Sequence, residues 1–256
     1  MRWPEYGWWI PSPMGQDMAR ILIIGSSAGL GRTVAQGCRA DGDWVAMADG
    51  ATDATGPWDL YIPVNPADPE APTRAMEAVR ADQGALDAVV VAASLVQAAP
   101  VGQWTAAMWD EATAVNLRLP FLAAQAAVDL LVASPQASLI FISSTATVRG
   151  QPHTHAYQAT KAGLAGLVRS LAAELGPRGI RVNVALVGWV DTPQTRAFWS
   201  AREDADAGRQ AVDGRIPLRR HGRAEEAAAL VRYLISPAAS YISGAMIPVD
   251  GGDTAV

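Results

Sequence analysis

The chain has 256 residues, of which half are hydrophobic and 18% are charged, and its formal net charge is −5. This composition supplies enough apolar side chains for a buried core, which excludes an intrinsically disordered chain. Acidic and basic residues are mixed along the sequence, so nothing indicates the basic surface that nucleic acid requires. A single cysteine, Cys38, cannot form an intrachain disulfide, and we expect a reducing, cytoplasmic environment.

Membrane and metal partners are not expected either. No apolar run approaches the roughly 18 residues that span a bilayer. The three histidines and Cys38 lack the spacing of metal ligands, so no metal is predicted. Residues 1–17 contain three tryptophans and three prolines without the pattern of a signal peptide. We interpret them either as the product of an upstream start codon or as an arm that packs on the fold or on a neighbouring subunit.

Short apolar runs alternate with longer helix-like stretches from residue 20 onward, which predicts a parallel sheet covered by helices. The predicted strands are Arg20–Ile24, Trp44–Ala48, Leu60–Val64, Leu86–Ala92, Leu139–Ile142, Arg181–Leu186 and Met246–Val249. The predicted helices are Gly29–Ala40, Thr73–Arg80, Thr105–Ser134, His155–Leu175 and Glu225–Leu234. We expect one Rossmann-like, three-layer α/β/α domain over residues 18–256, with a mostly parallel sheet of seven strands.

A glycine-rich stretch, Gly25-Ser-Ser-Ala-Gly29-Leu-Gly31, follows the first predicted strand. Glycines at this place permit a tight turn, close approach of the backbone to a pyrophosphate, and close packing of a helix whose N-terminus favours the phosphate charge. Asp49 ends the second predicted strand. A carboxylate there accepts hydrogen bonds from ribose hydroxyls and repels a 2′-phosphate, and the adjacent positions supply no cation. The pattern therefore predicts NAD rather than NADP.

Tyr157 and Lys161 are four residues apart on a predicted helix, so their side chains project from one face. An ammonium favours a neighbouring phenolate, and we expect it to lower the pKa of Tyr157 from about 10 toward neutrality. Such a tyrosine would be a general acid/base. Lys161 is also the only lysine among 20 basic residues, which indicates that a compact ammonium is specifically required there.

Ser144 and Asn116 are two further candidates. Ser144 ends the fifth predicted strand, at the sheet edge where open α/β proteins build their sites, and its hydroxyl could hold a substrate oxygen. Asn116 lies four residues before Pro120, which has no N–H for the Asn116 carbonyl. We expect a kinked helix and a free carbonyl that binds a relay water. A polar strand end and a capping asparagine are the simpler alternatives.

Together these residues resemble the short-chain dehydrogenase/reductase family over essentially Ala19 to Gly252. The resemblance extends through Gly188-Trp-Val190-Asp-Thr192, Ile216-Pro-Leu-Arg-Arg-His-Gly222 and Ile242-Ser-Gly-Ala-Met-Ile-Pro-Val-Asp-Gly-Gly252. It implies hydride transfer between NAD(H) and a small-molecule secondary alcohol or ketone, in a homotetramer joined partly through the helices that carry Asn116 and Tyr157. The implied catalytic residues are Asn116, Ser144, Tyr157 and Lys161.

The resemblance also implies which residues contact the cofactor and the substrate. The cofactor residues would be Gly25, Ser27, Gly29, Leu30, Gly31, Asp49, Val64, Asn65, Ala93, Tyr157, Lys161, Val190 and Thr192. The substrate residues would be Ser144, Tyr157, Trp189, Phe198 and Trp199. A mobile lid is expected over about residues 193–214, and its aromatic side chains favour an apolar or cyclic substrate.

The sequence departs from the family pattern at three places. Ile24 stands where the family has threonine, Val91-Ala-Ala-Ser94 stands for Asn-Asn-Ala-Gly, and Val187-Gly188 stands for Pro-Gly. These changes bear on stability and cofactor affinity rather than on chemistry, because the four catalytic residues are present. Two alternatives remain: an NADPH-dependent 3-oxoacyl-thioester reductase and a non-catalytic NAD-binding scaffold.

Overall fold

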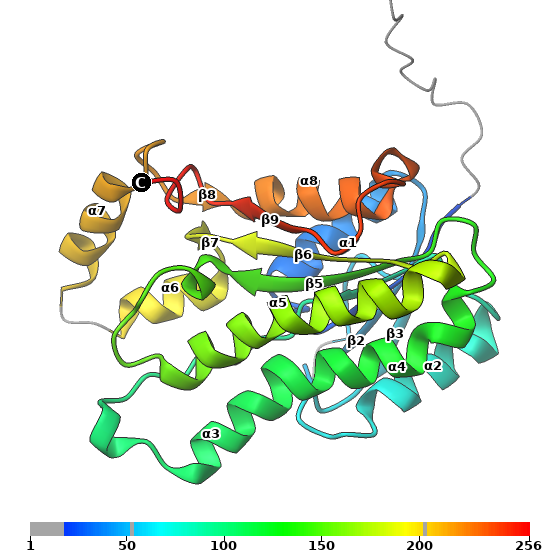
Figure 1. Cartoon of the computed structure of the whole chain (residues 1–256), viewed down its shortest axis with the longest axis horizontal. Coiled ribbons are helices and arrows are strands. Elements are labelled where there is room, and N and C mark those ends of the chain that lie inside the picture. The colour runs from blue at the N-terminus through cyan, green and yellow to red at the C-terminus, as the bar shows by residue number, and fades with distance from the viewer. Residues whose placement is uncertain (1–17, 52–53, 202–203) are drawn as a thin grey trace, which may run out of the picture.

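A computed structural model of the chain describes residues 18–51, 54–201 and 204–256, so the interpretation of residues 1–17 lies outside the described part. Seven parallel strands form one sheet in the order β3-β2-β1-β4-β5-β6-β9 (Figure 1). Their bounds are β1 Arg20–Ile24, β2 Trp44–Asp49, β3 Leu60–Pro63, β4 Ala88–Val91, β5 Ser138–Ser144, β6 Arg181–Val187 and β9 Met246–Val249. The predicted seven-stranded Rossmann-like sheet is confirmed.

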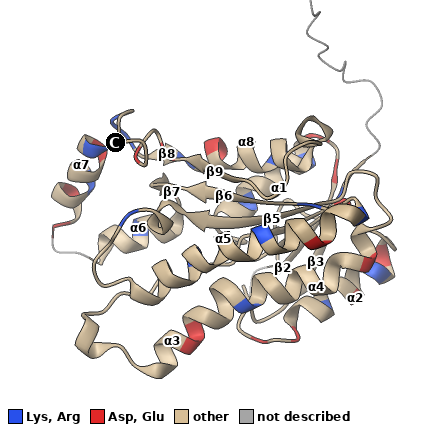
Figure 2. Cartoon of the chain, viewed as in Figure 1, with Lys and Arg blue, Asp and Glu red and all other residues tan. Residues whose placement is uncertain are grey.

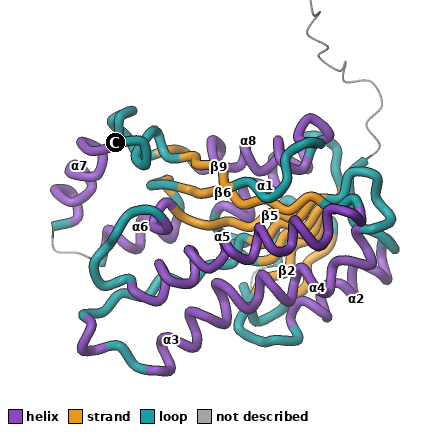
Figure 3. Tube along the Cα trace, viewed as in Figure 1, coloured by secondary structure: helices purple, strands orange, loops and turns teal. Residues whose placement is uncertain are grey.

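Helices cover both faces of this sheet (Figure 3). The helices are α1 Leu30–Ala40, α2 Ala71–Asp82, α3 Ala106–Thr113, α4 Leu119–Leu131, α5 His155–Leu175, α6 Pro193–Ser200, α7 Ala205–Arg215 and α8 Ala224–Ile235. A π-helical turn, Ala114–Arg118, joins α3 to α4, and the short strands β7 Val190–Asp191 and β8 Gly222–Arg223 pair with each other. Single 3₁₀ turns are formed by Val101–Gln103, Thr145–Thr147, Gly176–Arg178 and Pro237–Ala239.

The position of β1 in the middle of the sheet explains why residues Ile21–Ile24 are all apolar. Leu22 and Ile24 face the core that contains residues of α2, α4 and α5, whereas Ile21 and Ile23 face the core under α1 and α8. All four side chains are essentially inaccessible to solvent. Because successive side chains of a strand point to opposite faces, a strand covered on both sides requires apolar residues at every position.

The order of the strands places a crevice between β1 and β4. The chain proceeds from β1 outward to β3 and then returns past β1 to β4, so loops after β1 and β4 leave the sheet in opposite directions. Ligands of open α/β sheets bind at such a switch point, outside the carboxyl ends of the strands. Helices α6 and α7 lie beyond this same edge (Figure 1).

The stretch Ala106–Leu131, from α3 through α4, has a markedly apolar composition. It is a 26-residue helical segment that is long and apolar enough, by length and composition, to cross a membrane. Within the fold, 56% of its most apolar window is buried, because the segment packs on the sheet as a core helix. Its apolar character is therefore explained by packing.

Candidate active site

The glycine turn after β1 is shaped by close backbone contacts. Gly25 has φ of +88°, and a Cβ on it would lie 2.5 Å from atoms of Ala93 at the end of β4. A Cβ on Gly31 would lie 2.4 Å from the Gly25 carbonyl oxygen. Helix α1 begins at Leu30 without a side-chain cap at Gly29. These features leave an open cradle at a helix N-terminus, as a pyrophosphate requires.

Asp49 lies at the end of β2 beside this cradle. Its Oδ2 accepts a hydrogen bond from the Ser27 amide at 2.6 Å, and its Oδ1 accepts one from the Gly50 amide at 2.7 Å. The carboxylate is thereby held against the turn. Each oxygen has a further lone pair, so the side chain retains the capacity to accept ribose hydroxyls.

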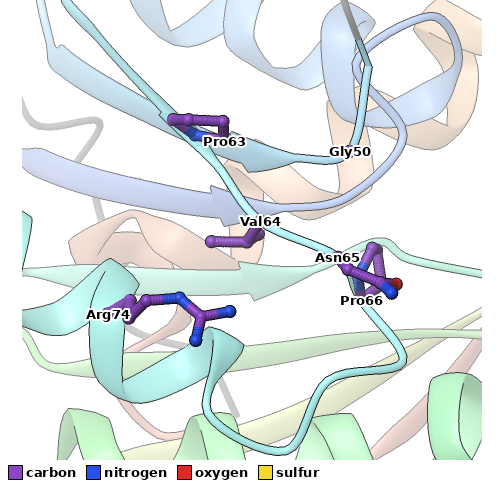
Figure 4. Close-up of a pocket in the computed structure, with 6 residues that line it drawn as sticks. All are labelled: Gly50, Pro63, Val64, Asn65, Pro66 and Arg74. Carbon is purple, nitrogen blue, oxygen red and sulfur yellow. The ribbon is translucent and has the colours of Figure 1, made fainter.

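A hollow of about 540 Å³ opens next to Asp49 and contains a cation that sequence reasoning missed. Arg74 extends from α2 toward Val64 and Asn65, across from Gly50 (Figure 4). Its Nη2 lies 2.6 Å from Oδ2 of Asp68, which partly neutralises its charge. No signal near the glycine turn could have indicated Arg74, because it follows Gly25 by 49 residues and approaches only through the fold.

Strand β5 and helix α5 are joined by hydrogen bonds beside the expected catalytic residues. The Ser143 hydroxyl donates to the Lys161 carbonyl at 3.0 Å, and Lys161 Nζ donates to the Ile142 carbonyl at 2.9 Å. Lys161 is only 2% exposed, and its Nζ lies 5.9 Å from the centre of the Tyr157 ring. Lys161 and Tyr157 therefore do project from one face of α5, as the spacing predicts.

Burial changes the pKa values of both expected catalytic residues of α5. It raises the pKa of Tyr157, against the smaller opposing effects of Ser144 at the end of β5 and of Ser94 in the loop after β4. Burial also lowers the pKa of Lys161 to about 7. The expectation that Lys161 lowers the pKa of Tyr157 below 10 is therefore wrong. Desolvation of the buried phenol raises its pKa by more than the neighbouring polar groups of the protein lower it.

Asn116 lies in the π-helical turn and is completely buried. Its Oδ1 accepts from the Leu95 amide at 2.8 Å, and its Nδ2 donates to the Leu95 carbonyl at 2.9 Å. The Leu119 amide bonds to the Ala114 carbonyl, five residues back, which is the irregularity expected upstream of Pro120. The side chain of Asn116 is thus not a helix cap, and it clamps the loop after β4.

The other expected cofactor residues border the same edge of the sheet. Ala93 follows β4, Val64 and Asn65 follow β3, and Val190 lies in β7. The Thr192 hydroxyl caps α6 by accepting from the Thr195 amide at 3.2 Å. A second cavity of about 230 Å³ links several of these positions; it is lined by Gly25, Ser26, Asp49, Asn65, Pro66, Ala67, Ala93, Ser94, Leu95, Glu111 and Val115.

The expected substrate residues form an aromatic cluster. The ring centre of Trp189 lies 5.4 Å from that of Phe198 and 5.1 Å from that of Trp199. Trp199 is only 7% exposed, and its indole N–H donates to Nε2 of His221 at 3.3 Å. Trp199 therefore packs the inside of the expected lid, whereas Trp189 and Phe198 are partly exposed. Within the described parts of residues 193–214, this lid consists of two helices, α6 and α7.

These features fit a nicotinamide dinucleotide. The cradle at Gly25 and Gly31 has no room for a Cβ, α1 begins uncapped, and Asp49 stands at the end of β2. Positions of basic and acidic residues are interspersed along the ribbon in Figure 2. Among the described residues, no group of three or more His, Cys, Asp or Glu could hold a metal ion.

Comparison with known proteins supports this interpretation. A family model described as Enoyl-(Acyl carrier protein) reductase matches residues 24–254. The 3-oxoacyl-[acyl-carrier-protein] reductase MabA of Mycobacterium tuberculosis is 34% identical over 233 residues, which cover 91% of each chain. Cis-4-hydroxycyclohexanecarboxylate dehydrogenase of Sinomonas cyclohexanicum is 31% identical over 255 residues, covering 95% of this chain and 100% of the relative. The crystal structure of levodione reductase superimposes with a TM-score of 0.87 at 26% identity, covering 93% and 98% of the two chains.

The chain belongs to the short-chain dehydrogenase/reductase family, whose members are oxidoreductases that use a nicotinamide cofactor. The resemblance inferred from the sequence is confirmed. Its relatives include both acyl-thioester reductases and dehydrogenases of other compounds, so family membership defines the reaction class more closely than the substrate.

Proposed function

We propose that the protein is an NAD(H)-dependent oxidoreductase that interconverts a secondary alcohol and a ketone, with Tyr157 as its general acid/base. The observation that carries this proposal is the position of Tyr157 beside Lys161 on α5, where Lys161 Nζ bonds to the Ile142 carbonyl of β5, the strand that ends at Ser144. The sheet edge at Ser144 also carries the glycine cradle after β1. Hydroxyl side chains at the edge that carries a dinucleotide cradle suit hydride transfer at a carbonyl carbon.

Bound NAD(H) would supply or accept the hydride. In reduction, Tyr157 donates its phenolic proton to the carbonyl oxygen, and Ser144 donates a hydrogen bond that holds the same oxygen. In oxidation, Tyr157 accepts the proton of the alcohol. Lys161 would hold the nicotinamide ribose, and a water on the Asn116 carbonyl would connect Lys161 to solvent. The expected cofactor contacts of Val190 and Thr192 belong to the same proposal.

Preference for NAD(H) is supported by Asp49. Its carboxylate lies in the cradle, bonded to the Ser27 and Gly50 amides, where it would repel a 2′-phosphate. Arg74 lines the hollow beside Gly50 and could oppose this effect, but its guanidinium is paired with Asp68. We therefore expect the carboxylate to dominate cofactor selection.

An apolar or cyclic substrate is supported by the aromatic cluster. Trp189 and Phe198 present partly exposed rings near α6, at the edge of the sheet that carries Ser144. The relative named cis-4-hydroxycyclohexanecarboxylate dehydrogenase, whose name specifies a compound with a cyclohexane ring, is similar in sequence over nearly the whole chain. We assign Trp189 and Phe198 to substrate binding and Trp199 to packing of the lid.

The second candidate is an NADPH-dependent 3-oxoacyl-thioester reductase. It is favoured by the name of a relative with 34% identity and by the position of Arg74 beside Gly50. In this alternative Arg74 would leave Asp68 and hold the 2′-phosphate. The two candidates share their catalytic residues, so cofactor and substrate must discriminate them.

We further propose that the enzyme works in the cytoplasm as a homotetramer. Trp109 on α3 and Phe121 on α4 are each 45% exposed, which is unusual for large apolar side chains and suits an interface between subunits. Sedimentation equilibrium would measure the assembly, and a monomer at micromolar concentration would contradict this proposal.

The test compares NADH and NADPH oxidation, followed by nicotinamide absorbance, over cyclic, aryl and aliphatic ketones and acetoacetyl-CoA. Asp49→Asn and Arg74→Ala provide matched variants on the two sides of the cofactor hollow. We expect kcat/KM to favour NADH and cyclic or aryl ketones, Asp49→Asn to erode the NADH preference about tenfold or more, and Arg74→Ala to change little.

The opposite pattern would support the alternative. Wild-type preference for NADPH with acetoacetyl-CoA, lost in Arg74→Ala, would contradict the assignment of NAD(H) and of the ketone class. The assay thus identifies the cofactor and the substrate class together.

A further inference from the structure

His221 is a buried histidine that the proposed mechanism does not use. Its side chain is 2% exposed, and it directly precedes β8. The Gly222 amide donates to the Trp189 carbonyl at 2.8 Å, and Gly222 pairs with Val190 of β7. The backbone at His221 is therefore fixed to the segment that carries Trp189.

Both ring nitrogens of His221 have hydrogen-bond partners on the lid. The Trp199 indole N–H of α6 donates to Nε2 at 3.3 Å, and Nδ1 lies 2.6 Å from Oδ1 of Asp213 on α7. An indole N–H can only donate, so Nε2 accepts and carries no proton. The proton of the neutral ring is then on Nδ1, which donates it to the Asp213 carboxylate. The two hydrogen bonds thus select one tautomer of His221.

Trp199 is the side chain through which His221 acts on the aromatic cluster. The ring centre of Trp199 lies 5.1 Å from that of Trp189 and 5.1 Å from that of Phe198. Helix α7 also packs closely on Trp199, because a Cβ on Gly208 would lie 2.8 Å from its indole ring. The position of the Trp199 indole therefore determines how the two partly exposed rings are placed.

The aromatic cluster lies beside the proposed site of proton transfer. Ser144 at the end of β5 pairs in register with Val187 at the end of β6, and Trp189 follows Val187 by two residues. Helices α6 and α7 lie at the same end of the sheet (Figure 1). A substrate whose oxygen is held by Ser144 would thus lie close to Trp189.

Ion pairs on the surface also join the lid to β7. Asp191 pairs with Arg196 of α6 at 2.9 Å and with Arg209 of α7 at 4.0 Å. These side chains are exposed, so water and salt screen their attraction. The ring of His221 is shielded from water, and its hydrogen bonds therefore constrain the two helices more strongly.

We propose that His221 is a positioning residue that fixes Trp199 and thereby the substrate-binding face of the aromatic cluster. The neutral Nδ1–H tautomer holds α6 by accepting from Trp199 and holds α7 by donating to Asp213. This inference rests on the proposed function, which assigns Trp189 and Phe198 to substrate binding. It makes His221 a determinant of selectivity for ring-shaped ketones, because a displaced Trp199 indole would release the two rings that it supports.

The first readout is the tautomer of His221 in the wild-type protein. Long-range proton–nitrogen NMR of the full-length chain, with isotopically labelled histidine, distinguishes a protonated from an unprotonated ring nitrogen. The chain has three histidines, and His221→Gln assigns the signals of His221. At neutral pH we expect Nδ1 to be protonated and Nε2 to be unprotonated. A protonated Nε2 would overturn the proposal, because it could not accept from Trp199.

The second readout is the division of the effect between KM and kcat, with NADH as cofactor. His221→Phe keeps an aromatic ring and removes both hydrogen bonds, and we expect it to raise KM for cyclic and aryl ketones about three- to tenfold. The kcat for these ketones, KM for small aliphatic ketones and the dissociation constant for NADH should each stay within about twofold. His221→Gln should restore KM, because its amide offers a donor and an acceptor side by side, like the two ring nitrogens.

Two further variants separate positioning from general stability. Trp199→Phe removes the donor to Nε2, and combining it with His221→Phe should be no worse than the more severe of the two alone, because both break one interaction. Arg209→Gln removes only an exposed ion pair of α7 and should leave KM unchanged. Additive effects of the two aromatic substitutions would contradict the proposal. So would a uniform loss of kcat for every ketone together with a lower melting temperature, which a merely structural histidine would give.

Failure of the proposed function gives a different result. If no ketone is turned over, or if Tyr157→Phe keeps full turnover, the proposed reaction is wrong. The NMR spectrum still decides the positioning role in that case, because the Nδ1–H tautomer supports the bond from Trp199 and the Nε2–H tautomer excludes it.

Discussion

Burying the charged side chain of Lys161 costs electrostatic free energy. Its ammonium is 2% exposed and bonds to one backbone carbonyl, that of Ile142. Burial lowers the pKa of Lys161 from 10.5 to about 7, so the native state disfavours the proton that the unfolded chain holds. The site therefore keeps a cation that opposes folding, which is common where a group serves function rather than stability.

Lys161→Met should stabilise the purified protein at neutral or lower pH, by roughly 1–3 kcal/mol, while abolishing turnover. The sign follows from linkage: between pH of about 7 and 10.5 the unfolded chain binds more protons at this group, so wild-type stability rises with pH. The gain of the variant should thus be greatest below pH of about 7 and fade above it. Thermal unfolding across this pH range measures the effect.

Arg169→Met, on the exposed side of the same helix, is the control and should leave the pH dependence unchanged. A Lys161→Met variant that is less stable than wild type at every pH would show that Lys161 stabilises the fold.

The sequence predicted the chemical groups of the site better than their contacts. Spacing alone brought Tyr157 and Lys161 to one face of α5, because i and i+4 positions of a helix are neighbours. The contact of Asn116 with Leu95 and the approach of Arg74 to Gly50 join segments far apart in the chain. Such contacts depend on strand order and packing, which local pattern does not contain.

At the scale of elements, the loop after β4 depends on the π-helical turn. Asn116 supplies both hydrogen bonds that satisfy Leu95. The π-helical turn widens the helix by one residue just where Pro120 removes a backbone donor, and π turns of this kind frequently occur at functional sites. The turn thus orients a side chain toward the loop rather than only relieving strain.

Asn116→Ala should destabilise the protein by about 2–4 kcal/mol, because it leaves the amide and the carbonyl of Leu95 without partners. Chemical denaturation at equilibrium measures the loss. Gln125→Ala on the exposed face of α4 is the control and should change stability by less than about 0.5 kcal/mol. Equal stability of the Asn116 variant and the wild type would contradict the role of this clamp.

A second group of contacts, centred on Asp253, joins the lid to the C-terminal segment. Asp253 is 1% exposed, and its carboxylate receives Nε of Arg215 at 2.7 Å and Nη2 at 2.9 Å. Arg149, from the segment between β5 and α5, bonds to the carbonyls of Asp253 and Val256. One buried carboxylate thus connects α7, the loop after β5 and the end of the chain.

Asp253→Asn should loosen this connection and cost about 1–3 kcal/mol, because the substitution weakens the charge-assisted hydrogen bonds from Arg215 and the 3.6 Å ion pair with Arg149. Hydrogen exchange should speed up selectively in α7 and around Arg149. Asp206→Asn, at an exposed position of α7, is the matched control. Unchanged exchange in α7 would show that the lid is held by other contacts.

Some element boundaries were predicted correctly and others were not. Strands β1 and β9 and helix α5 have the predicted bounds. The predicted strand Leu86–Ala92 is longer than β4, which covers Ala88–Val91. The two-residue strands β7 and β8 were missed, as was the division of the lid into α6 and α7, because such short elements have too few residues to show a period.

For the molecule as a whole, the fold follows from the alternation of strands and helices. The nearly continuous apolar sequences of β1, β4 and β5 are typical of strands at the centre of a sheet. The switch point between β1 and β4 then gives the position of the crevice. The order of the strands was not predicted from the sequence. Pairing between strands is a long-range property that each run of residues leaves undetermined.

Binding of the cofactor should stabilise the whole molecule. A ligand at about a hundredfold excess over its dissociation constant contributes about 2.7 kcal/mol to unfolding. We expect NADH to raise the melting temperature more than NADPH at equal concentration, and Asp49→Asn to reduce the difference. Equal shifts with the two nucleotides in wild type would contradict selection by Asp49.

The most direct test of the central claim is a single variant, Tyr157→Phe, assayed with NADH and the best ketone of the panel. The variant removes one oxygen atom and keeps the ring. Turnover should fall by a factor of about 10²–10⁴, the contribution of a general acid/base, while nicotinamide fluorescence shows unchanged NADH binding. Turnover at the wild-type rate would contradict Tyr157 as the proton donor and with it the account of the site.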